Sequence, residues 1–280
     1  KKENYSVVSI IGDGALTGGM AYEALNNAAR MKKNFIIILN DNKMSISENV
    51  GGMSRYLGGL RTGNGYNDLK KNVADTLERI PVVGERMIDR IKRTKNSIKQ
   101  LFIPGMLFEN MGITYLGPVD GHNIQALCKV FKEAQKLDHA VLVHVLTKKG
   151  KGYEPAEKNP AAFHGVSPFD IKTGRPVAEK KYPTYTDVFS KKMCQLGETH
   201  PELVAVTAAM PAGTGVAAFG KRFPDRFFDV GIAESNLMGV AAGIATTGRV
   251  AFASTFAMFA AGRAFEQVRN SIGYPRLNVK

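Results

Sequence analysis

Two short apolar runs, separated by one helical stripe, constrain the fold more than any other feature of the sequence. The runs are Val7–Ile11 and Phe35–Leu39. Both are continuously apolar, as strands that are buried on both faces of a parallel sheet should be. Between them, the apolar residues of Met20–Ala28 recur at helical spacing. Strand, helix and strand in this order predict a βαβ unit with a right-handed crossover.

A polar insertion separates this unit from more of the same pattern. Residues 45–104 are rich in polar side chains and glycines and then turn helical, which predicts an excursion over one face of the sheet. Strand patterns at 113–116 and 140–146 then flank a helix pattern at 124–137. This alternation predicts one α/β domain over residues 1–150.

Proline and glycine crowd residues 151–183, which predicts an irregular linker without long regular elements. A second α/β pattern follows over residues 184–280. Its helix patterns lie at 185–198 and 235–245, and its strand patterns lie at 203–207, 226–230, 250–253 and 276–280. We therefore expect an α/β protein with two doubly wound parallel-sheet domains. Both domains look incomplete, because each end of the sequence has the pattern of a cut through a longer chain.

A net charge of +13 requires nucleic acid to be considered as a partner. Basic residues cluster between Arg86 and Lys99, where they alternate with apolar residues as in an amphipathic helix with a solvated basic face. The sequence has no motif that is typical of nucleic-acid-binding domains. The charge is therefore interpreted as a field that attracts phosphorylated substrates or as plain solubility, and no nucleic-acid partner is expected.

The sequence also bears on the compartment. No apolar run approaches the roughly 20 residues that cross a bilayer, so we expect no membrane partner. Cys128 and Cys194 lie far apart and close to no second metal-ligating residue in sequence, which is typical of free thiols in a reducing environment. The predicted localisation is cytoplasmic.

Two polar motifs follow the first two predicted strands. Gly12-Asp13-Gly14 ends one strand, and Asn40-Asp41-Asn42 ends the next about thirty residues later. Ligands of open parallel sheets bind beyond the carboxyl ends of the strands, so Asp13 and Asn42 can converge on one point. Carboxylate and amide oxygens suit Mg²⁺, which usually keeps water and substrate phosphates as further ligands. The glycines beside Asp13 allow a diphosphate to approach, with the following helix N-terminus directed at it.

A dinucleotide-binding fingerprint is the competing interpretation of the glycines. It requires Gly or Ala at position 17, where the sequence has Thr17. The Asp13 carboxylate would also repel a pyrophosphate unless a metal ion intervened. The motifs therefore favour a metal-bridged diphosphate site over a Rossmann site.

This pair of motifs resembles that of thiamine-diphosphate-dependent enzymes. Longer stretches resemble the 1-deoxy-D-xylulose-5-phosphate synthase family in particular, and the resemblance runs over roughly residues 5–234. The stretches are residues 12–26, 40–49, 116–122, 147–153, 163–170 and 206–215. The resemblance implies two incomplete domains of the transketolase-like type, one binding the diphosphate (1–150) and one binding the pyrimidine (184–280).

The resemblance also implies roles for individual residues at the diphosphate end of the cofactor. Mg²⁺ would be held by the side chains of Asp13 and Asn42 and by the backbone carbonyl of Met44. The diphosphate would meet the backbone at Gly14 and Ala15. Lys149 would contact the same diphosphate, and His164 would face the reacting carbon of the cofactor.

A second set of residues is implied at the pyrimidine end. Glu234 follows an apolar strand and begins a predicted helix, which suits a rigid and partly desolvated carboxylate beside N1′ of the aminopyrimidine. Without the resemblance, Glu234 is equally a helix-start residue. Met210 could lie under the bent cofactor, and Phe256 could stack on the pyrimidine, although both are also ordinary core residues by pattern.

The sequence departs from the synthase pattern after Glu234. It continues with Ser235-Asn236, and residues 253–269 look more like the C-terminal half of a split transketolase. Phe259 stands where the synthases have an arginine that binds the substrate phosphate, and Arg263 is a possible substitute.

The resemblance implies a transferase that condenses pyruvate with glyceraldehyde 3-phosphate, with loss of CO₂, to give 1-deoxy-D-xylulose 5-phosphate. This product is a precursor of isoprenoids, thiamine and pyridoxal. Thiamine diphosphate and Mg²⁺ would be the cofactors, and a homodimer the assembly. The alternatives are a transketolase-like ketol transfer and a non-catalytic module for cofactor binding or dimerisation.

Overall fold

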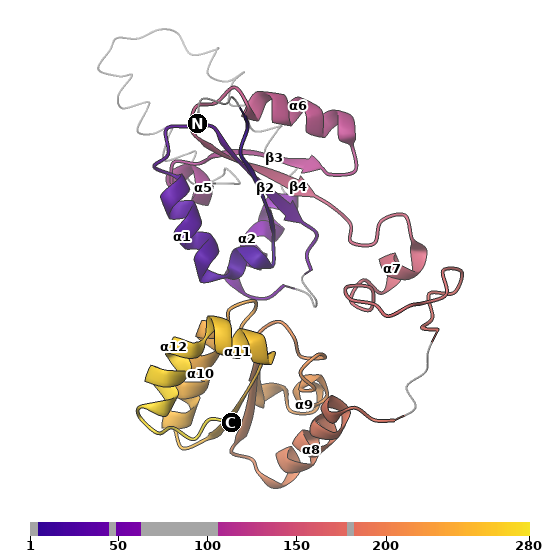
Figure 1. Cartoon of the computed structure of the whole chain (residues 1–280), viewed down its shortest axis with the longest axis vertical. Coiled ribbons are helices and arrows are strands. Elements are labelled where there is room, and N and C mark those ends of the chain that lie inside the picture. The colour runs from indigo at the N-terminus through magenta and orange to yellow at the C-terminus, as the bar shows by residue number, and fades with distance from the viewer. Residues whose placement is uncertain (1–4, 45–48, 63–105, 178–181) are drawn as a thin grey trace. The chain divides into compact units, whose positions relative to one another are not determined.

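The computed structural model describes residues 5–44, 49–62, 106–177 and 182–280, and these form two compact units. The first unit comprises residues 1–11, 23–41 and 52–147, and the second comprises residues 12–22, 42–51 and 148–280. Each unit is built on its own parallel sheet (Figure 1).

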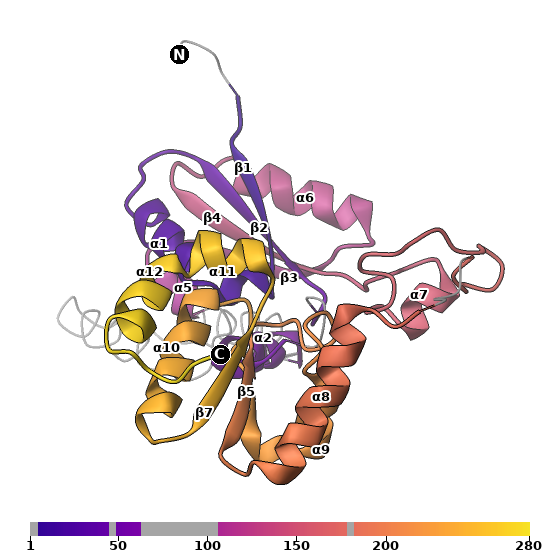
Figure 2. The same ribbon diagram turned by 60° about the horizontal axis from the view of Figure 1, so that its bottom comes forward.

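The sheet of the first unit has four strands in the order β1-β2-β4-β3. The strands are β1 Val8–Gly12, β2 Phe35–Asp41, β3 Thr114–Asp120 and β4 Ala140–Leu146. Helix α6 covers one face and α1, α2 and α5 cover the other (Figures 1 and 2). These helices span α1 Gly19–Ala28, α2 Gly51–Thr62, α5 Met106–Asn110 and α6 Ile124–Ala134.

Strands β2 and β4 form the centre of this sheet. They pair in parallel from Phe35 opposite Ala140 to Asp41 opposite Leu146. Apolar side chains of both strands and of β3 pack against α6, in a cluster that includes Ile36, Val141 and Val143. The continuously apolar run at 35–39 therefore marks a buried strand, as predicted.

Burial of the first apolar run was predicted wrongly. Strand β1 lies at the edge of the sheet, where Val8 is 48% exposed and Ile10 is 72% exposed. An apolar run shows that a segment can be buried, but it does not show how many neighbours the strand has.

The sheet of the second unit has three parallel strands in the order β6-β5-β7. They are β5 Leu203–Thr207, β6 Phe227–Asp229 and β7 Val250–Ser254. The helices are α8 Tyr185–Thr199, α9 Ala217–Arg222, α10 Glu234–Thr246, α11 Ala257–Arg263 and α12 Phe265–Gln267. Short 3₁₀ turns lie at Ala15–Thr17 and Pro224–Arg226, and a π-helical turn lies at Val268–Gly273.

Side chains of β5 alternate between two cores. Leu203 and Ala205 pack in a cluster with residues of α8 and α9, whereas Val204 and Val206 pack in a cluster with residues of α10. The strand is buried along its whole length, because helices cover both of its faces (Figure 2).

The last residues add a bridge beside β7. The backbone N–H of Lys280 donates to the carbonyl of Ala251, and the N–H of Ala253 donates to the carbonyl of Lys280, both at 2.8 Å. Val279 pairs with Ala251 in parallel. The strand pattern that the sequence shows at 276–280 is thus confirmed at its last two residues.

The Pro- and Gly-rich segment at 151–183 has one short helix, α7 Glu154–Lys158, among its described residues. Three aromatic rings hold it together, those of Tyr153, Phe163 and Phe169, with centroids 5.2–6.0 Å apart. The predicted basic helix between Arg86 and Lys99 lies outside the described residues. Within the described parts of the chain, no helix is both long enough and apolar enough to cross a membrane.

Helix α2 was not predicted at its place, because its glycines resemble a loop. Gly51, Gly52, Gly58 and Gly59 all fall within it. Leu57 and Leu60 are nevertheless 1% and 3% exposed. Tertiary burial of these two side chains therefore outweighs the low helix propensity of glycine.

The N-terminus of α8 provides a test of local helix stability. The Thr184 hydroxyl accepts from the N–H of Asp187 at 3.2 Å, and the Asp187 carboxylate accepts from the N–H of Thr184 at 2.8 Å. We expect Thr184→Ala to lower the free energy of unfolding by about 1 kcal/mol. Urea titration checks this. Thr199→Ala, at the other end of the same helix, is the control and should cost less, so equal losses would contradict a capping role.

Candidate functional site

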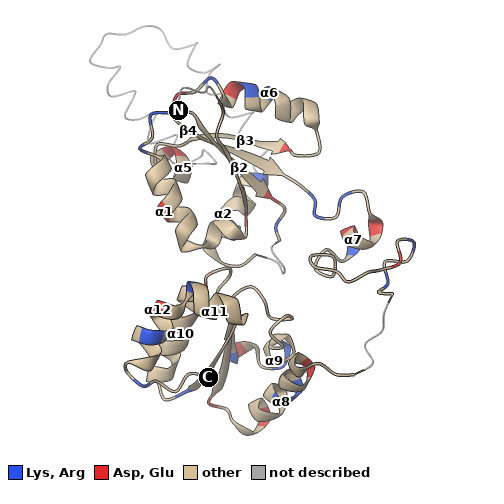
Figure 3. Ribbon diagram, in the orientation of Figure 1, with Lys and Arg blue, Asp and Glu red and all other residues tan. Residues whose placement is uncertain are grey.

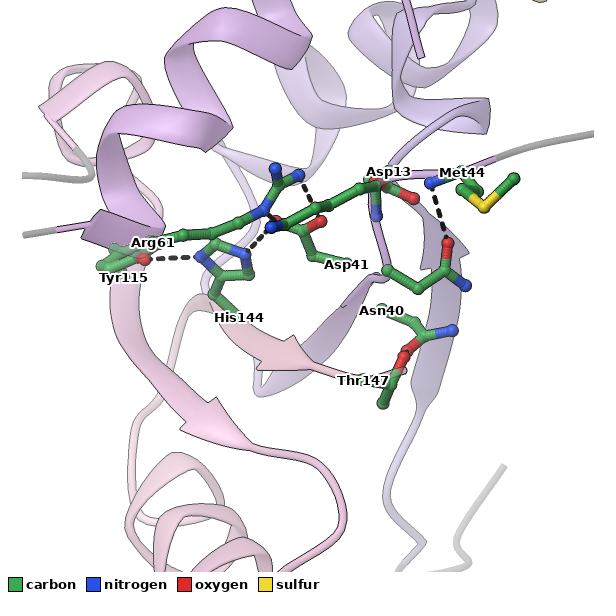
Figure 4. A network of polar contacts seen from close by, with 10 residues as sticks. Asp13, Asn40, Asp41, Met44, Arg61, Tyr115, His144 and Thr147 are labelled. Carbon is green, nitrogen blue, oxygen red and sulfur yellow. Dashed lines mark hydrogen bonds and ion pairs between the residues drawn. The ribbon is translucent and has the colours of Figure 1, made fainter. Parts of the chain in front are cut away.

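Asp13 and the turn after β2 lie side by side. The Asp13 side chain is 2% exposed, and its Oδ2 accepts from the backbone N–H of Lys43 at 2.8 Å. The Oδ1 of Asn42 accepts from the N–H of Met44 at 3.0 Å, which closes the turn. Lys43 holds a positive φ of 69° at its centre. Figure 4 shows Asp13 and Met44 beside the end of β2.

These groups fit a magnesium ion. A carboxylate, an amide oxygen and a backbone carbonyl are hard oxygen donors, and Mg²⁺ completes its shell with water and phosphate oxygens. Among the described residues, no group of three or more His, Cys, Asp or Glu side chains is placed to hold a metal ion. Two side chains and one carbonyl leave most of an octahedral shell to water and phosphate oxygens, which suits an ion that is shared with a diphosphate.

Gly14 and Ala15 lead into a 3₁₀ turn, Ala15–Thr17, instead of directly into the helix. The Thr17 hydroxyl donates to the carbonyl of Gly14 at 2.7 Å, and α1 begins only at Gly19. The predicted diphosphate contacts are the backbone groups of Gly14 and Ala15. Ala15 is thus the first residue of this turn, and Gly14 directly precedes it.

Lys149 and His164 form a second pair of predicted site residues. The Nζ of Lys149 lies 3.0 Å from the Nδ1 of His164. Desolvation lowers the pKa of Lys149, and the charge of Asp13 partly opposes this shift. Partial burial, and then the Lys149 ammonium, lower the pKa of His164. The pair therefore favours a neutral imidazole beside a cation.

This pair predicts a pH effect. His164 should titrate below about 6.5, the value of an unperturbed histidine. Because the folded-state pKa is lowered, the contribution of His164 to stability is present above about 6.5 and is lost as the pH falls through the folded-state pKa. Lys149→Met should return the pKa only part of the way, since the larger cause is burial. NMR titration measures this, with Lys148→Met as the neighbouring control; an unchanged His164 pKa in Lys149→Met would contradict the pairing.

A buried polar network lies beside the candidate metal turn (Figure 4). Asp41 is 1% exposed, and its carboxylate binds the guanidinium of Arg61 from α2. The same carboxylate lies 2.8 Å from the Nε2 of His144, and the Nδ1 of His144 lies 2.7 Å from the Tyr115 hydroxyl. Beside it, Thr147 Oγ1 donates to Asn40 Oδ1 at 2.7 Å.

This network was not predicted from the sequence. Its signal is a histidine inside the otherwise apolar run 140–146, because a buried polar side chain needs a partner. The partner, Asp41, is 103 residues away from His144 and is brought to it only by the pairing of β2 with β4.

Removal of one hydroxyl tests the network. Tyr115→Phe keeps the ring but leaves the buried Nδ1 of His144 without this hydrogen bond, so we expect a loss of about 1–3 kcal/mol in the free energy of unfolding. Tyr153→Phe, which removes an exposed hydrogen bond to Ile171, is the matched control and should cost clearly less. Denaturant titrations of both variants measure the difference, and similar losses would argue against the network.

Hydrogen bonds connect the carboxyl ends of the strands in the second sheet. The Thr207 hydroxyl at the end of β5 donates to the carbonyl of Ser254 at 2.9 Å. The Oδ1 of Asp229, at the end of β6, accepts from the N–H groups of Ala209 and Gly231, at 2.8 and 3.0 Å. Ala209 has a positive φ of 57°, and Met210 directly after it is 5% exposed. This arrangement fixes the loop that carries Met210 and the loop that leads into α10 and Glu234.

Glu234 is the first residue of α10, and its side chain is 5% exposed. Nη1 of Arg263, at the end of α11, donates to Oε1 at 3.0 Å and to Oε2 at 3.3 Å. Phe256, the residue before α11, is 44% exposed, and its ring stacks on that of Phe259. Arg263, the candidate ligand of the substrate phosphate, thus binds the carboxylate of Glu234, the predicted catalytic residue.

Basic residues do not gather at one element in the described parts of the chain. Figure 3 shows lysines and arginines on helices and loops of both units.

Comparison with known proteins agrees with the motifs. Residues 1–147 match the model of a family described as 1-deoxy-D-xylulose-5-phosphate synthase, and residues 181–280 match the pyrimidine-binding domain of transketolase. The chain belongs to the 1-deoxy-D-xylulose-5-phosphate synthase family.

Curated relatives extend the match along the whole chain. The 1-deoxy-D-xylulose-5-phosphate synthase of Lachnoclostridium phytofermentans is 53% identical over 278 residues, and that of Desulfitobacterium hafniense is 50% identical over 279 residues. These matches cover 99% and 100% of this chain but 44% of each relative. The chain thus spans less than half the length of these members of the family.

A comparison with solved structures finds transketolases among the similar chains. A split-gene transketolase, described as an inactive β4 tetramer, is 56% identical over 32% of this chain and 30% of its own, with a TM-score of 0.30.

Proposed function

We propose that this chain is the cofactor-binding part of an enzyme that condenses pyruvate with glyceraldehyde 3-phosphate, with loss of CO₂, to give 1-deoxy-D-xylulose 5-phosphate. The observation that carries the proposal is the buried Asp13 carboxylate beside the Asn42–Met44 turn, in a chain of this family. A carboxylate at 2% exposure is costly unless a cation or hydrogen bonds compensate for it. A magnesium ion that carries a diphosphate supplies such compensation.

Asp13, Asn42 and the carbonyl of Met44 would hold Mg²⁺. Lys149 and the backbone at Gly14 and Ala15 would bind the diphosphate of thiamine diphosphate, where the ammonium offsets its negative charge. Thiamine diphosphate supplies the electron sink for cleavage of the bond to the carboxylate of pyruvate.

Other residues of the chain would hold the cofactor ring and the substrate. Glu234 would share a proton with N1′ of the aminopyrimidine, because it is rigid at the start of α10 and almost fully desolvated. Met210 would support the cofactor from below, and Phe256 would stack on the pyrimidine. His164, whose pKa is lowered by burial and then by the Lys149 ammonium, would face the reacting carbon of the cofactor.

The proposal includes a cytoplasmic location and a homodimeric assembly. The free cysteines Cys128 and Cys194 support a reducing cytoplasm. Exposed apolar side chains on α11 and α12, Met258 at 71% and Phe265 at 60%, support a homodimer as the working assembly.

A transketolase-like ketol transfer is the second candidate. It is favoured by the match of residues 181–280 to the transketolase pyrimidine-binding domain and by the identity to the split-gene transketolase. This reaction takes its two-carbon unit from a sugar phosphate and releases no CO₂, so the two functions differ in a directly measurable product.

Calorimetric titration with thiamine diphosphate tests the site. We expect binding in the presence of Mg²⁺, none with EDTA, and a loss of at least about a hundredfold in affinity in Asp13→Ala, since the charged metal ligand is removed. Asp138→Ala removes a carboxylate that is 99% exposed and is the control with unchanged affinity.

The same samples separate the two reactions. Release of CO₂ from pyruvate on addition of glyceraldehyde 3-phosphate would support the synthase, whereas turnover only with a ketose phosphate donor would support transketolase chemistry. Magnesium-independent binding, or full affinity in Asp13→Ala, would refute the proposed site.

A further inference from the structure

The carboxylate of Glu234 is held by a contact from a distant part of the chain. Its side chain is 5% exposed, and Nη1 of Arg263 reaches both of its oxygens, at 3.0 and 3.3 Å. The Ser235 hydroxyl donates to the backbone carbonyl of Arg263 at 2.9 Å. The first turn of α10 and the end of α11 are therefore joined through side chain and backbone together.

Arg263 also contacts the aromatic pair beside it. Its guanidinium carbon lies 4.3 Å from the centroid of the Phe259 ring. The Phe259 ring is stacked on the Phe256 ring, with centroids 6.0 Å apart and planes at 16°. One continuous series of contacts thus runs from the carboxylate of Glu234 through Arg263 and Phe259 to Phe256.

We propose that Arg263 is a positioning residue that fixes Glu234 and Phe256 relative to each other, so that the carboxylate and the ring meet the same aminopyrimidine. This inference rests on the proposed function, in which both residues touch that ring. Arg263 acts through them and does not touch the cofactor.

The chemistry of the groups is consistent with this role. An ionised carboxylate has about four acceptor positions, so Glu234 can keep Arg263 and still bind a ring nitrogen. A guanidinium is planar and can bind a carboxylate at its edge while it stacks on an aromatic face. A lysine ammonium can replace the charge but not the stacking.

The position also argues against Arg263 as a ligand of the substrate phosphate. Its side chain is 53% exposed, but its Nη1 donates to Glu234 and its guanidinium lies over the Phe259 ring. A phosphate on this guanidinium would compete with the buried carboxylate for the same cation. Leaving that carboxylate uncompensated is costly.

The test compares two ligands that share a diphosphate but differ in the ring. Thiamine diphosphate and inorganic pyrophosphate, each with Mg²⁺, are titrated into the full chain and into Arg263→Met and Arg263→Lys. We expect Arg263→Met to lose about tenfold or more in affinity for thiamine diphosphate, since a charge-assisted contact that orders Glu234 is removed. Pyrophosphate affinity should stay within about twofold, and Arg263→Lys should recover part of the loss.

Arg269→Met is the matched control. Arg269 lies in the π-helical turn after α12 and forms an exposed ion pair with Glu266 of α12, at 2.8 Å. Its substitution removes an arginine that is paired with a carboxylate other than Glu234. It should leave both affinities unchanged. Thermal melts of all variants show that they are folded at the titration temperature.

The outcomes separate the two proposals. Equal losses for both ligands in Arg263→Met would show a general structural defect and overturn the positioning role. Unchanged or tighter binding of thiamine diphosphate would overturn it as well, because Arg263 would then be a bystander or a competitor for Glu234. If the wild-type chain binds pyrophosphate but not thiamine diphosphate, or binds neither, the proposed function fails and the inference fails with it.

Discussion

The carboxylate of Asp41 is buried, so it needs a counter-charge and hydrogen-bonding partners from within the protein. Residues of the first sheet and of one helix beside it supply them. The charge of Asp41 is met by the guanidinium of Arg61 from α2, and its carboxylate lies 2.8 Å from the Nε2 of His144 in β4, with Tyr115 of β3 behind the histidine. One carboxylate therefore ties a helix to three parallel strands. Because Asp41 is flanked by Asn40 and Asn42, the same ties determine how the end of β2 presents its polar side chains. Asp41 thus lies directly before the candidate metal turn, while its own carboxylate is occupied by Arg61 and His144.

The second unit also contains a buried carboxylate that is paired with an arginine, at the start of α10. Glu234 is almost fully desolvated, and its counter-ion, Arg263, comes from a different helix. In both units a carboxylate near the carboxyl ends of the strands is paired with an arginine that approaches from a helix. The pairs differ in what stands beside them: His144 completes the network in the first unit, and the Phe259 ring supports the guanidinium in the second. The first pair directly precedes the candidate metal turn, and the second is joined through the Phe259 ring to the exposed ring of Phe256.

Sequence reasoning was most successful where the physical signal is local. Continuous apolar runs located β2, β4 and β5, because burial on both faces needs no knowledge of distant residues. It failed where the outcome depends on neighbours in space. The run at Val7–Ile11 could not reveal an edge position, and the glycines of α2 concealed a helix that Leu57 and Leu60 stabilise through packing. Residues of the site follow the same rule, since Asp13 and Asn42 end consecutive strands, whereas Arg263 is 29 residues from Glu234 and meets it only after folding.

The exposed first strand has a consequence for work with this chain in solution. Among the described residues β1 has a neighbour on one side only, and Val8 and Ile10 are largely uncovered. An apolar edge strand with unused backbone donors and acceptors can pair with the same edge of a second molecule. Self-association through this edge depends on protein concentration and does not need a cofactor. Dilution series at constant ligand would therefore distinguish adhesion between sheet edges from an assembly that belongs to the working enzyme.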